Sequence, residues 1–155
     1  MSMNERVQVV AFVRHGIACH NLWDPVTHQP PRLEDPNLWD PPLVYEGKQQ
    51  ALEAGEYTKT WWRTTQLGEE IELIVTSPLT RCIQTTMLGF LPGDGYTCTQ
   101  KSDADEPEIY CTELVREAFG MHYPDKRRSK SLLQVRCSLV PDLVNINTRF
   151  GHNFV

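Results

Sequence analysis

Three adjacent residues near the N-terminus combine groups that suit phosphate chemistry. Arg14 carries a planar guanidinium whose N–H groups match the oxygens of a phosphate. His15 carries a ring nitrogen that can attack phosphorus, and Gly16 allows the backbone to approach a bound phosphate closely. The tripeptide therefore predicts a phosphate-binding and nucleophilic centre. The alternative is an ordinary turn at a strand end with exposed charge.

A second arginine follows another predicted strand. Residues 71–76 (IELIVT) form a short apolar run, and Ser77-Pro78 predicts a helix start with Ser77 as N-cap and Pro78 at the first position. Arg81 would then lie in the first turn of a helix that reaches about Gly89. Free N–H groups and the helix dipole favour an anion there. Arg81 is thus a second candidate phosphate ligand, unless it simply pairs with a nearby carboxylate.

A carboxylic acid follows a third predicted strand, at residues 108–111. The stretch Leu114–Gly120 contains Glu117, which could donate a proton to a leaving oxygen. The alternative interpretation is a solvated glutamate on a helix face.

The elements that must position these residues alternate between strand and helix. Apolar runs at 7–13, 71–76 and 108–111 predict buried strands, and residues 45–64 and 77–89 predict helices. Further short strands are predicted at 96–99 and 143–146, and the proline-rich segment 23–43 is predicted to be a loop. This alternation is typical of an α/β domain, whose ligands bind beyond the carboxyl ends of the strands.

Four motifs, in order, resemble one family. FVRHG followed by Asn21, then LVYEGKQQA, TSPLTRCIQTT and LVREAFGMHYPDKRRS, are similar to the signature blocks of the histidine phosphatase superfamily, also called phosphoglycerate mutase-like. The last block resembles a plant, fungal and protist branch. Together the motifs cover roughly residues 7–134.

The resemblance implies a role for each matching residue. His15 would be the phosphorylated nucleophile, Arg14 and Arg81 would clamp the phosphoryl oxygens, and Asn21 would contact the phosphate or its surroundings. Glu117 would be the general acid, with Glu113 as the alternative one helical turn earlier. No metal or cofactor is needed, because the arginines supply the positive charge. A metal site built from His15, His20, Asp24 and His28 fits no zinc spacing.

The fold implied is a three-layer α/β/α sandwich with a mostly parallel sheet, over residues 1–134. The family also has a second pocket histidine after a later strand. The histidines here are His15, His20, His28, His122 and His152. We interpret His20 and His28 as too early, His122 as part of GMHY, and His152 as lacking a preceding apolar strand. We therefore expect a C-terminally incomplete domain, with residues 135–155 as a divergent tail.

Composition narrows the remaining choices. The 155 residues suit one domain, and a net charge of −5 does not favour a nucleic-acid partner. The N-terminus lacks a signal-peptide pattern and no apolar run is long enough to span a bilayer. Five cysteines without a C-x-x-C pair favour neither a disulfide framework nor a zinc site, so a cytoplasmic location is expected.

The sequence thus predicts a phosphomonoester hydrolase that acts through a phosphohistidine on His15. Its substrate would be a small phosphorylated molecule or a phosphoprotein, with no membrane partner. The alternative is a degenerate, non-catalytic phosphate- or phosphoprotein-binding module that lacks the second histidine. The sheet edge left by an incomplete domain could support a homodimer. The basic run Lys126-Arg127-Arg128 with Lys130 is interpreted as a solvated loop rather than a second phosphate site.

Overall fold

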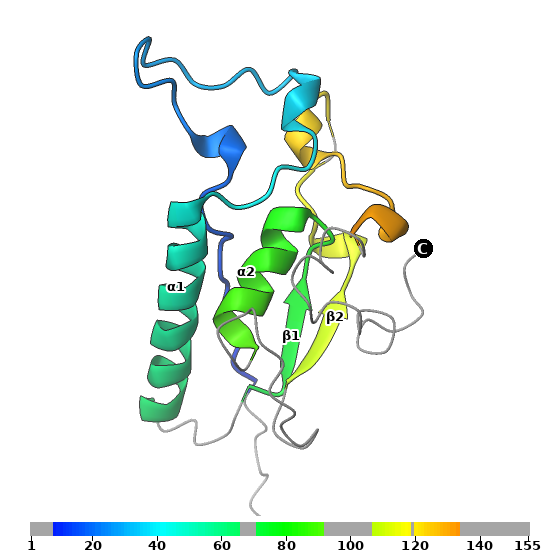
Figure 1. The fold of residues 1–155 in the computed structure, drawn as a ribbon. Coiled ribbons are helices and arrows are strands. Elements are labelled where there is room, and N and C mark those ends of the chain that lie inside the picture. Colours follow the sequence, from blue (N-terminus) through cyan, green and yellow to red (C-terminus); the bar gives the residue numbers. More distant parts are fainter. Residues whose placement is uncertain (1–7, 66–70, 92–106, 119, 134–155) are drawn as a thin grey trace, which may run out of the picture.

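The computed structural model describes residues 8–65, 71–91, 107–118 and 120–133. Its regular elements are α1 (Tyr45–Thr64), β1 (Leu73–Thr76), α2 (Thr80–Phe90) and β2 (Glu108–Cys111), with four short 3₁₀ turns, η1 (Cys19–Asn21), η2 (Pro36–Leu38), η3 (Glu113–Val115) and η4 (Tyr123–Asp125). Figure 1 shows α2 lying between α1 and the strands. Among the described residues, no helix is both long and apolar enough to cross a bilayer.

The two strands form a parallel pair. Leu73 pairs with Glu108 and Thr76 with Cys111, so β1 and β2 run in register over their whole length. Parallel strands joined by a helix confirm the predicted α/β class. The expected strands at 96–99 and 143–146, and the expected tail at 135–155, lie outside the described residues.

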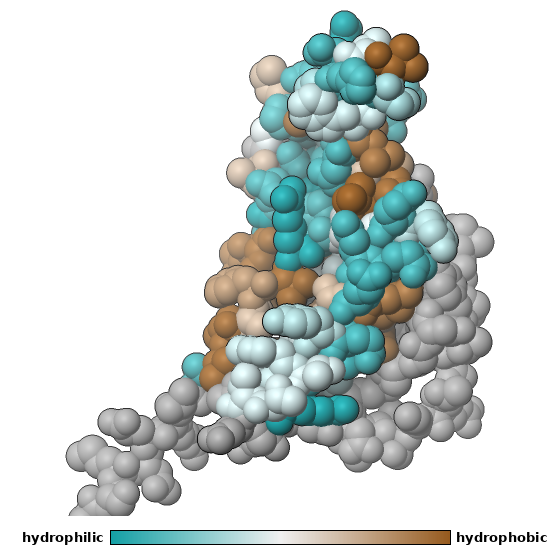
Figure 2. Space-filling view, turned by 90° about the vertical axis from the view of Figure 1, so that its left-hand side faces the viewer, coloured by the Kyte–Doolittle hydropathy of each residue, from teal (hydrophilic) through white to brown (hydrophobic). Residues whose placement is uncertain are grey.

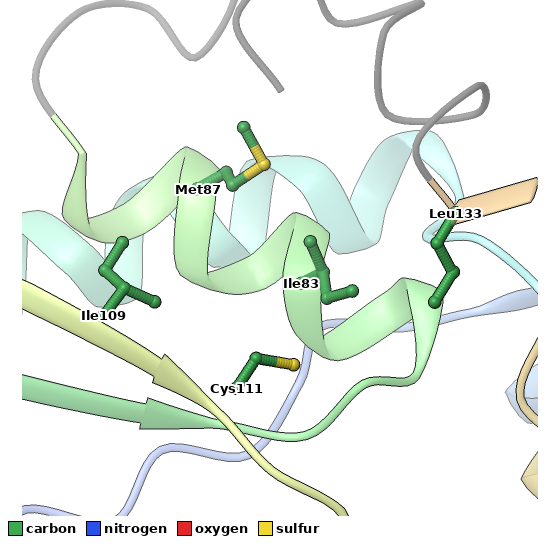
Figure 3. Packing of buried hydrophobic residues seen from close by; sticks show 5 residues of the cluster. All are labelled: Ile83, Met87, Ile109, Cys111 and Leu133. Carbon is green, nitrogen blue, oxygen red and sulfur yellow. The ribbon is translucent and has the colours of Figure 1, made fainter. Parts of the chain in front are cut away.

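Only one face of this sheet is covered in the described part of the chain. Ile109 and Cys111 are buried beneath α2, together with Ile83 and Met87 of that helix and Leu133 (Figure 3). On the opposite face, Leu73 and Val75 remain 53% and 48% exposed. The prediction of a strand buried on both faces at 71–76 was therefore wrong for the described residues, because α2 covers one side only.

The helix α1 begins and ends as predicted, and its glycines have a packing role. Gly47, Ala51 and Gly55 are spaced four residues apart and form one buried stripe. A Cβ atom on Gly55 would lie 1.9 Å from the carbonyl oxygen of Gly89 in α2. The small residues thus let the backbones of α1 and α2 come together. Figure 2 shows the outer side of α1, where hydrophilic and hydrophobic residues are mixed.

The predicted first strand is not a strand in the structure. Residues 8–13 form no ladder with another described segment, and Val10 and Phe12 are 70% and 95% exposed. A strand requires a hydrogen-bonded neighbour, and β1 pairs with β2 among the described residues. The apolar pattern alone therefore mispredicted this segment.

Candidate active site

The loop that carries His15 is held against the start of α1. The amide of Ile17 donates to Oε1 of Gln50 at 3.0 Å, and the amide of Val44 donates to the carbonyl of Ile17 at 3.0 Å. A Cβ atom on Gly16 would lie 2.1 Å from the carbonyl oxygen of Gly47. Gly16 is thus required because two backbones pack together there, a reason that differs from the close approach of phosphate expected from the sequence.

The two ring nitrogens of His15 have different partners, which identifies its tautomer. Nδ1 lies 2.7 Å from the carbonyl oxygen of Gly16, and Nε2 lies 3.1 Å from Nε of Arg81. A carbonyl can only accept and a guanidinium can only donate. Nδ1 therefore carries the proton, and Nε2 presents a lone pair.

The electrostatic surroundings keep this imidazole neutral. Burial lowers the pKa of His15 below its ordinary value of 6.5, and the charges of Arg81 and Arg14 lower it further. The hydrogen bond to Gly16 and the charge of Glu117 act in the opposite direction but are outweighed. A neutral imidazole whose Nε2 carries no proton is the form that can act as a nucleophile.

Arg81 lies at the start of α2 and is 1% exposed. Besides its bond to His15, it donates from Nη1 to the carbonyl of Pro124 at 2.7 Å and from Nη2 to Oδ1 of Asp125 at 3.1 Å. The predicted convergence of Arg81 on His15 is therefore present. The alternative of a carboxylate partner is present as well, since Asp125 and Arg81 form a buried ion pair.

Asp125 and Asp40 are two buried carboxylates that the sequence analysis missed. Asp125 comes from η4 and orients the guanidinium of Arg81. Asp40, 0% exposed, accepts from the amide of Thr80 at 2.8 Å and from its hydroxyl at 2.7 Å. Burial raises the pKa of the Asp40 carboxyl, although these hydrogen bonds oppose the shift. Asp40 lies in a loop and Asp125 in a short 3₁₀ turn, and sequence spacing gives no signal of such contacts there.

Asp40 also explains why α2 begins later than predicted. The helix starts at Thr80, and Ser77 is not its N-cap. The carboxylate of Asp40, from the proline-rich loop, satisfies the free amide at the first turn instead.

Asn21 closes the loop rather than reaching outward with its oxygen. The side-chain Oδ1 of Asn21 accepts from the backbone amide of Ala18 at 3.0 Å. The backbone amide of Asn21 donates to the carbonyl of Ala18 at 2.8 Å. Any contact between Asn21 and a phosphate would therefore come from its side-chain nitrogen.

A pocket of about 500 Å³ lies in front of these residues. Its lining includes Arg14, His15, His20 and Asn21, together with four residues of the proline-rich loop: Trp23, Pro30, Pro31 and Leu33. The structure thus brings Arg14, His15 and Asn21 to one pocket. Arg81 contacts Nε2 of His15 but is not among the residues that line the pocket.

Comparison with known proteins indicates a distant relationship to one group of proteins. A protein of Arabidopsis thaliana named phosphoglycerate mutase-like protein is 29% identical to this chain over 143 residues, which cover 80% of the chain. A second protein of the same plant, named phosphoglycerate mutase-like protein 1, is 27% identical over 143 residues, which cover 81% of the chain. The chain is related to the phosphoglycerate mutase-like proteins of the histidine phosphatase superfamily. It spans about half the length of these relatives, 49% and 48%. No family model and no solved structure matches it.

The two candidate acids differ sharply in their contacts. Glu113 forms ion pairs with Arg116, at 3.1 Å, and with Arg127. Glu117 is exposed, lies beyond η3, and is close enough for its charge to act on His15. Glu113 is therefore already engaged by two guanidinium groups, and its carboxylate is tied to structural ion pairs.

The basic run at residues 126–128 is engaged in structural contacts. Arg127 pairs with Glu113, Arg128 donates to the carbonyl of Trp39 at 2.7 Å, and Lys126 lies 3.7 Å above the ring of Tyr123. The expectation of a solvated loop was therefore wrong for these three residues, which are half-buried and paired within the protein. In the described part of the chain, no three potential metal ligands cluster together.

Proposed function

We propose that this chain hydrolyses phosphomonoesters through a phosphohistidine on His15. The observation that carries the proposal is the tautomer of His15, with Nδ1 held by Gly16 and the lone pair of Nε2 beside Arg81. The relatives named phosphoglycerate mutase-like support the histidine phosphatase superfamily in general, and the proposal goes further on the geometry of His15.

The proposed reaction has two steps. Nε2 of His15 forms a bond to phosphorus while the ester P–O bond breaks, and Glu117 protonates the departing alkoxide. Water then attacks the phosphohistidine and gives a proton to the Glu117 carboxylate, which restores the acid, while the P–N bond breaks and inorganic phosphate leaves. Arg14 and Arg81 stabilise the charge that spreads over the phosphoryl oxygens in each transition state.

Arg81 also supports a second candidate function. Its guanidinium is buried and already donates to His15, Pro124 and Asp125. A phosphate that enters must displace the contact between Arg81 and Nε2 before that nitrogen can attack. A chain in which this contact persists would hold phosphate beside Arg14 without turnover, as a phosphate- or phosphoprotein-binding module.

The three-layer sandwich belongs to the same proposal. The helices α1 and α2 lie on one side of the parallel pair (Figure 1). The side chains of Leu73, Val75 and Tyr110 share the other face of the pair and are exposed. A second helical layer over those side chains would complete the arrangement.

Trapping the intermediate tests the proposed reaction. The full chain would be incubated with a radiolabelled aryl phosphate, quenched, and examined for acid-labile, alkali-stable label. We expect label on wild-type protein and on the His28→Asn control, which changes a histidine outside the pocket lining, and none on His15→Ala. Absence of turnover and of label in folded wild-type protein would overturn the hydrolase. Thermal stabilisation by phosphate in that sample would favour the binding module.

A further inference from the structure

A second imidazole lies beside that of His15. The ring centroids of His15 and His20 are 5.8 Å apart, with their planes tilted by 48°. His20 belongs to η1 and lines the same pocket as Arg14 and His15. From its position in the sequence, His20 is expected to lie too early in the chain to be a pocket histidine. The structure nevertheless places it in the pocket lining.

One nitrogen of His20 has no partner in the described structure. Its Nδ1 is buried and makes no hydrogen bond with the described residues. Leaving a buried polar atom unpaired costs free energy, and such atoms call for an explanation in a bound ligand or a catalytic role. The loop that holds His20 is closed by Asn21 and Ala18, so the ring is presented on an organised segment.

Charged groups surround His20 from three segments. Arg81 of α2 and Arg14 of the N-terminal segment disfavour its protonated form, as does His15, and Asp125 of η4 favours it. Burial and these charges, Arg81 foremost, lower the pKa of His20 to about 4. The ring is therefore neutral at neutral pH, and the charges of Arg81 and Arg14 both act against its protonation.

We propose that His20 is a second phosphate-binding histidine of this site, which donates a hydrogen bond to a phosphoryl oxygen. This inference rests on the proposed function, since it assigns a further ligand to the same phosphate. A dianionic phosphate offsets the charges of Arg14 and Arg81 and favours the protonated ring. His20 then takes up a proton as phosphate binds, and the site gains a cation only when an anion is present.

Binding of inorganic phosphate to the full chain tests the proposal. Calorimetry in buffers of different ionisation enthalpy measures proton uptake, and NMR of the imidazole protons follows His20 directly. We expect phosphate to shift the titration of His20 upward. In His20→Gln we expect proton uptake to fall and phosphate to bind about 10-fold more weakly, the size of one lost charge-assisted hydrogen bond. The His28→Asn control should behave as wild type.

Two results would overturn the proposal. One is phosphate binding that leaves the His20 resonances and their titration unchanged, which is measured on wild-type protein and so does not depend on the folding of a variant. The other is a folded His20→Gln chain with wild-type affinity and proton uptake. If His20 is protonated by phosphate but no phosphohistidine is trapped, the hydrolase fails and this inference stands. If phosphohistidine forms on His15 while phosphate leaves the titration of His20 unchanged, the hydrolase stands and this inference fails.

Discussion

At the scale of single residues, the two arginines of the site differ in burial and in how firmly they are held. Arg81 is immobilised by Pro124 and Asp125, and it in turn faces Nε2 of His15. Arg14 lines the pocket and is exposed. A buried, preorganised arginine and an exposed one suit a site that must be rigid at the nucleophile and open to the substrate.

Replacing Glu117 tests its assignment as the acid. Glu117→Gln removes the proton that a poor leaving group needs, so hydrolysis of alkyl phosphates should slow by about 10²–10⁴-fold. Hydrolysis of nitrophenyl phosphate, whose leaving group needs no proton, should change much less. Steady-state rates on the two substrates measure the difference.

Glu113→Gln is the matched control for that experiment. It breaks the ion pairs with Arg116 and Arg127, so we expect lower stability towards urea and no selective effect on alkyl phosphates. Selective loss on alkyl phosphates in Glu113→Gln, with Glu117→Gln unaffected, would reverse the assignment.

The titration of His15 should reflect the arginines around it. Its pKa lies below 6.5 in the substrate-free protein, with burial as the main cause and Arg81 and Arg14 as contributors. Arg14→Gln removes one cation, so the NMR titration midpoint of the His15 ring should move to higher pH. A midpoint above 6.5 in the wild-type protein would contradict the neutral nucleophile.

At the scale of elements, loops rather than strands fix the site. The proline-rich loop ends in Asp40, which has a positive φ of 44° and caps α2 from a position 40 residues away in sequence. Arg128 adds its own amide to the same carboxylate at 3.3 Å. One buried side chain thus joins the loop, α2 and the segment after η4.

Asp40→Ala should be costly for this reason. It leaves the amide and hydroxyl of Thr80 without their acceptor, and we expect a loss of about 1–3 kcal/mol in the free energy of unfolding. Asp35, which caps the exposed turn η2 by accepting from Asn37 at 2.9 Å, is the control. Asp35→Ala should lose less than about 1 kcal/mol in the same urea titration. Equal losses would show that Asp40 does not anchor α2.

The contact between α1 and the loop that carries His15 should be equally sensitive to substitution. In Gly16→Ala the new methyl would meet the carbonyl of Gly47, which is backbone and cannot rotate away, so we expect about 1–3 kcal/mol of destabilisation. Gly120→Ala adds a methyl where no atom lies within 4 Å and should change stability little. Chemical denaturation of both variants compares them. A neutral Gly16→Ala would show that the loop can move away from α1.

At the scale of the whole molecule, the proline-rich loop supplies one wall of the pocket. Trp23 is 64% exposed there, whereas Trp39 packs under Arg128, whose guanidinium lies 5.2 Å from the ring. Exposed aromatic rings at a pocket rim favour substrates with flat apolar groups.

Trp23→Ala should therefore raise KM for aryl phosphates by about 2–10-fold, the worth of one aromatic contact, with little change in kcat. Trp39→Ala should leave KM unchanged even where it lowers stability. Inhibition constants of aryl and alkyl phosphonates would check the same preference without turnover. An equal effect of Trp23→Ala on aryl and alkyl compounds would contradict a specific aromatic contact.

The sequence by itself determined the local features. The helix at 45–64, the strand at 108–111 and the α/β order follow from short-range patterns, and Arg14-His15-Gly16 and Arg81 stand out because their chemistry is carried by the residue types themselves. Contacts between distant segments decided the rest. Residues 8–13 do not form the predicted strand, and α2 begins later than predicted, where Asp40 caps it. Arg81 pairs with Asp125, and the ring of His20 lies beside that of His15. Strand pairing, capping from a loop and ring-to-ring contact all depend on which segments meet in space, and hydrophobic period and motif spacing carry no information about that.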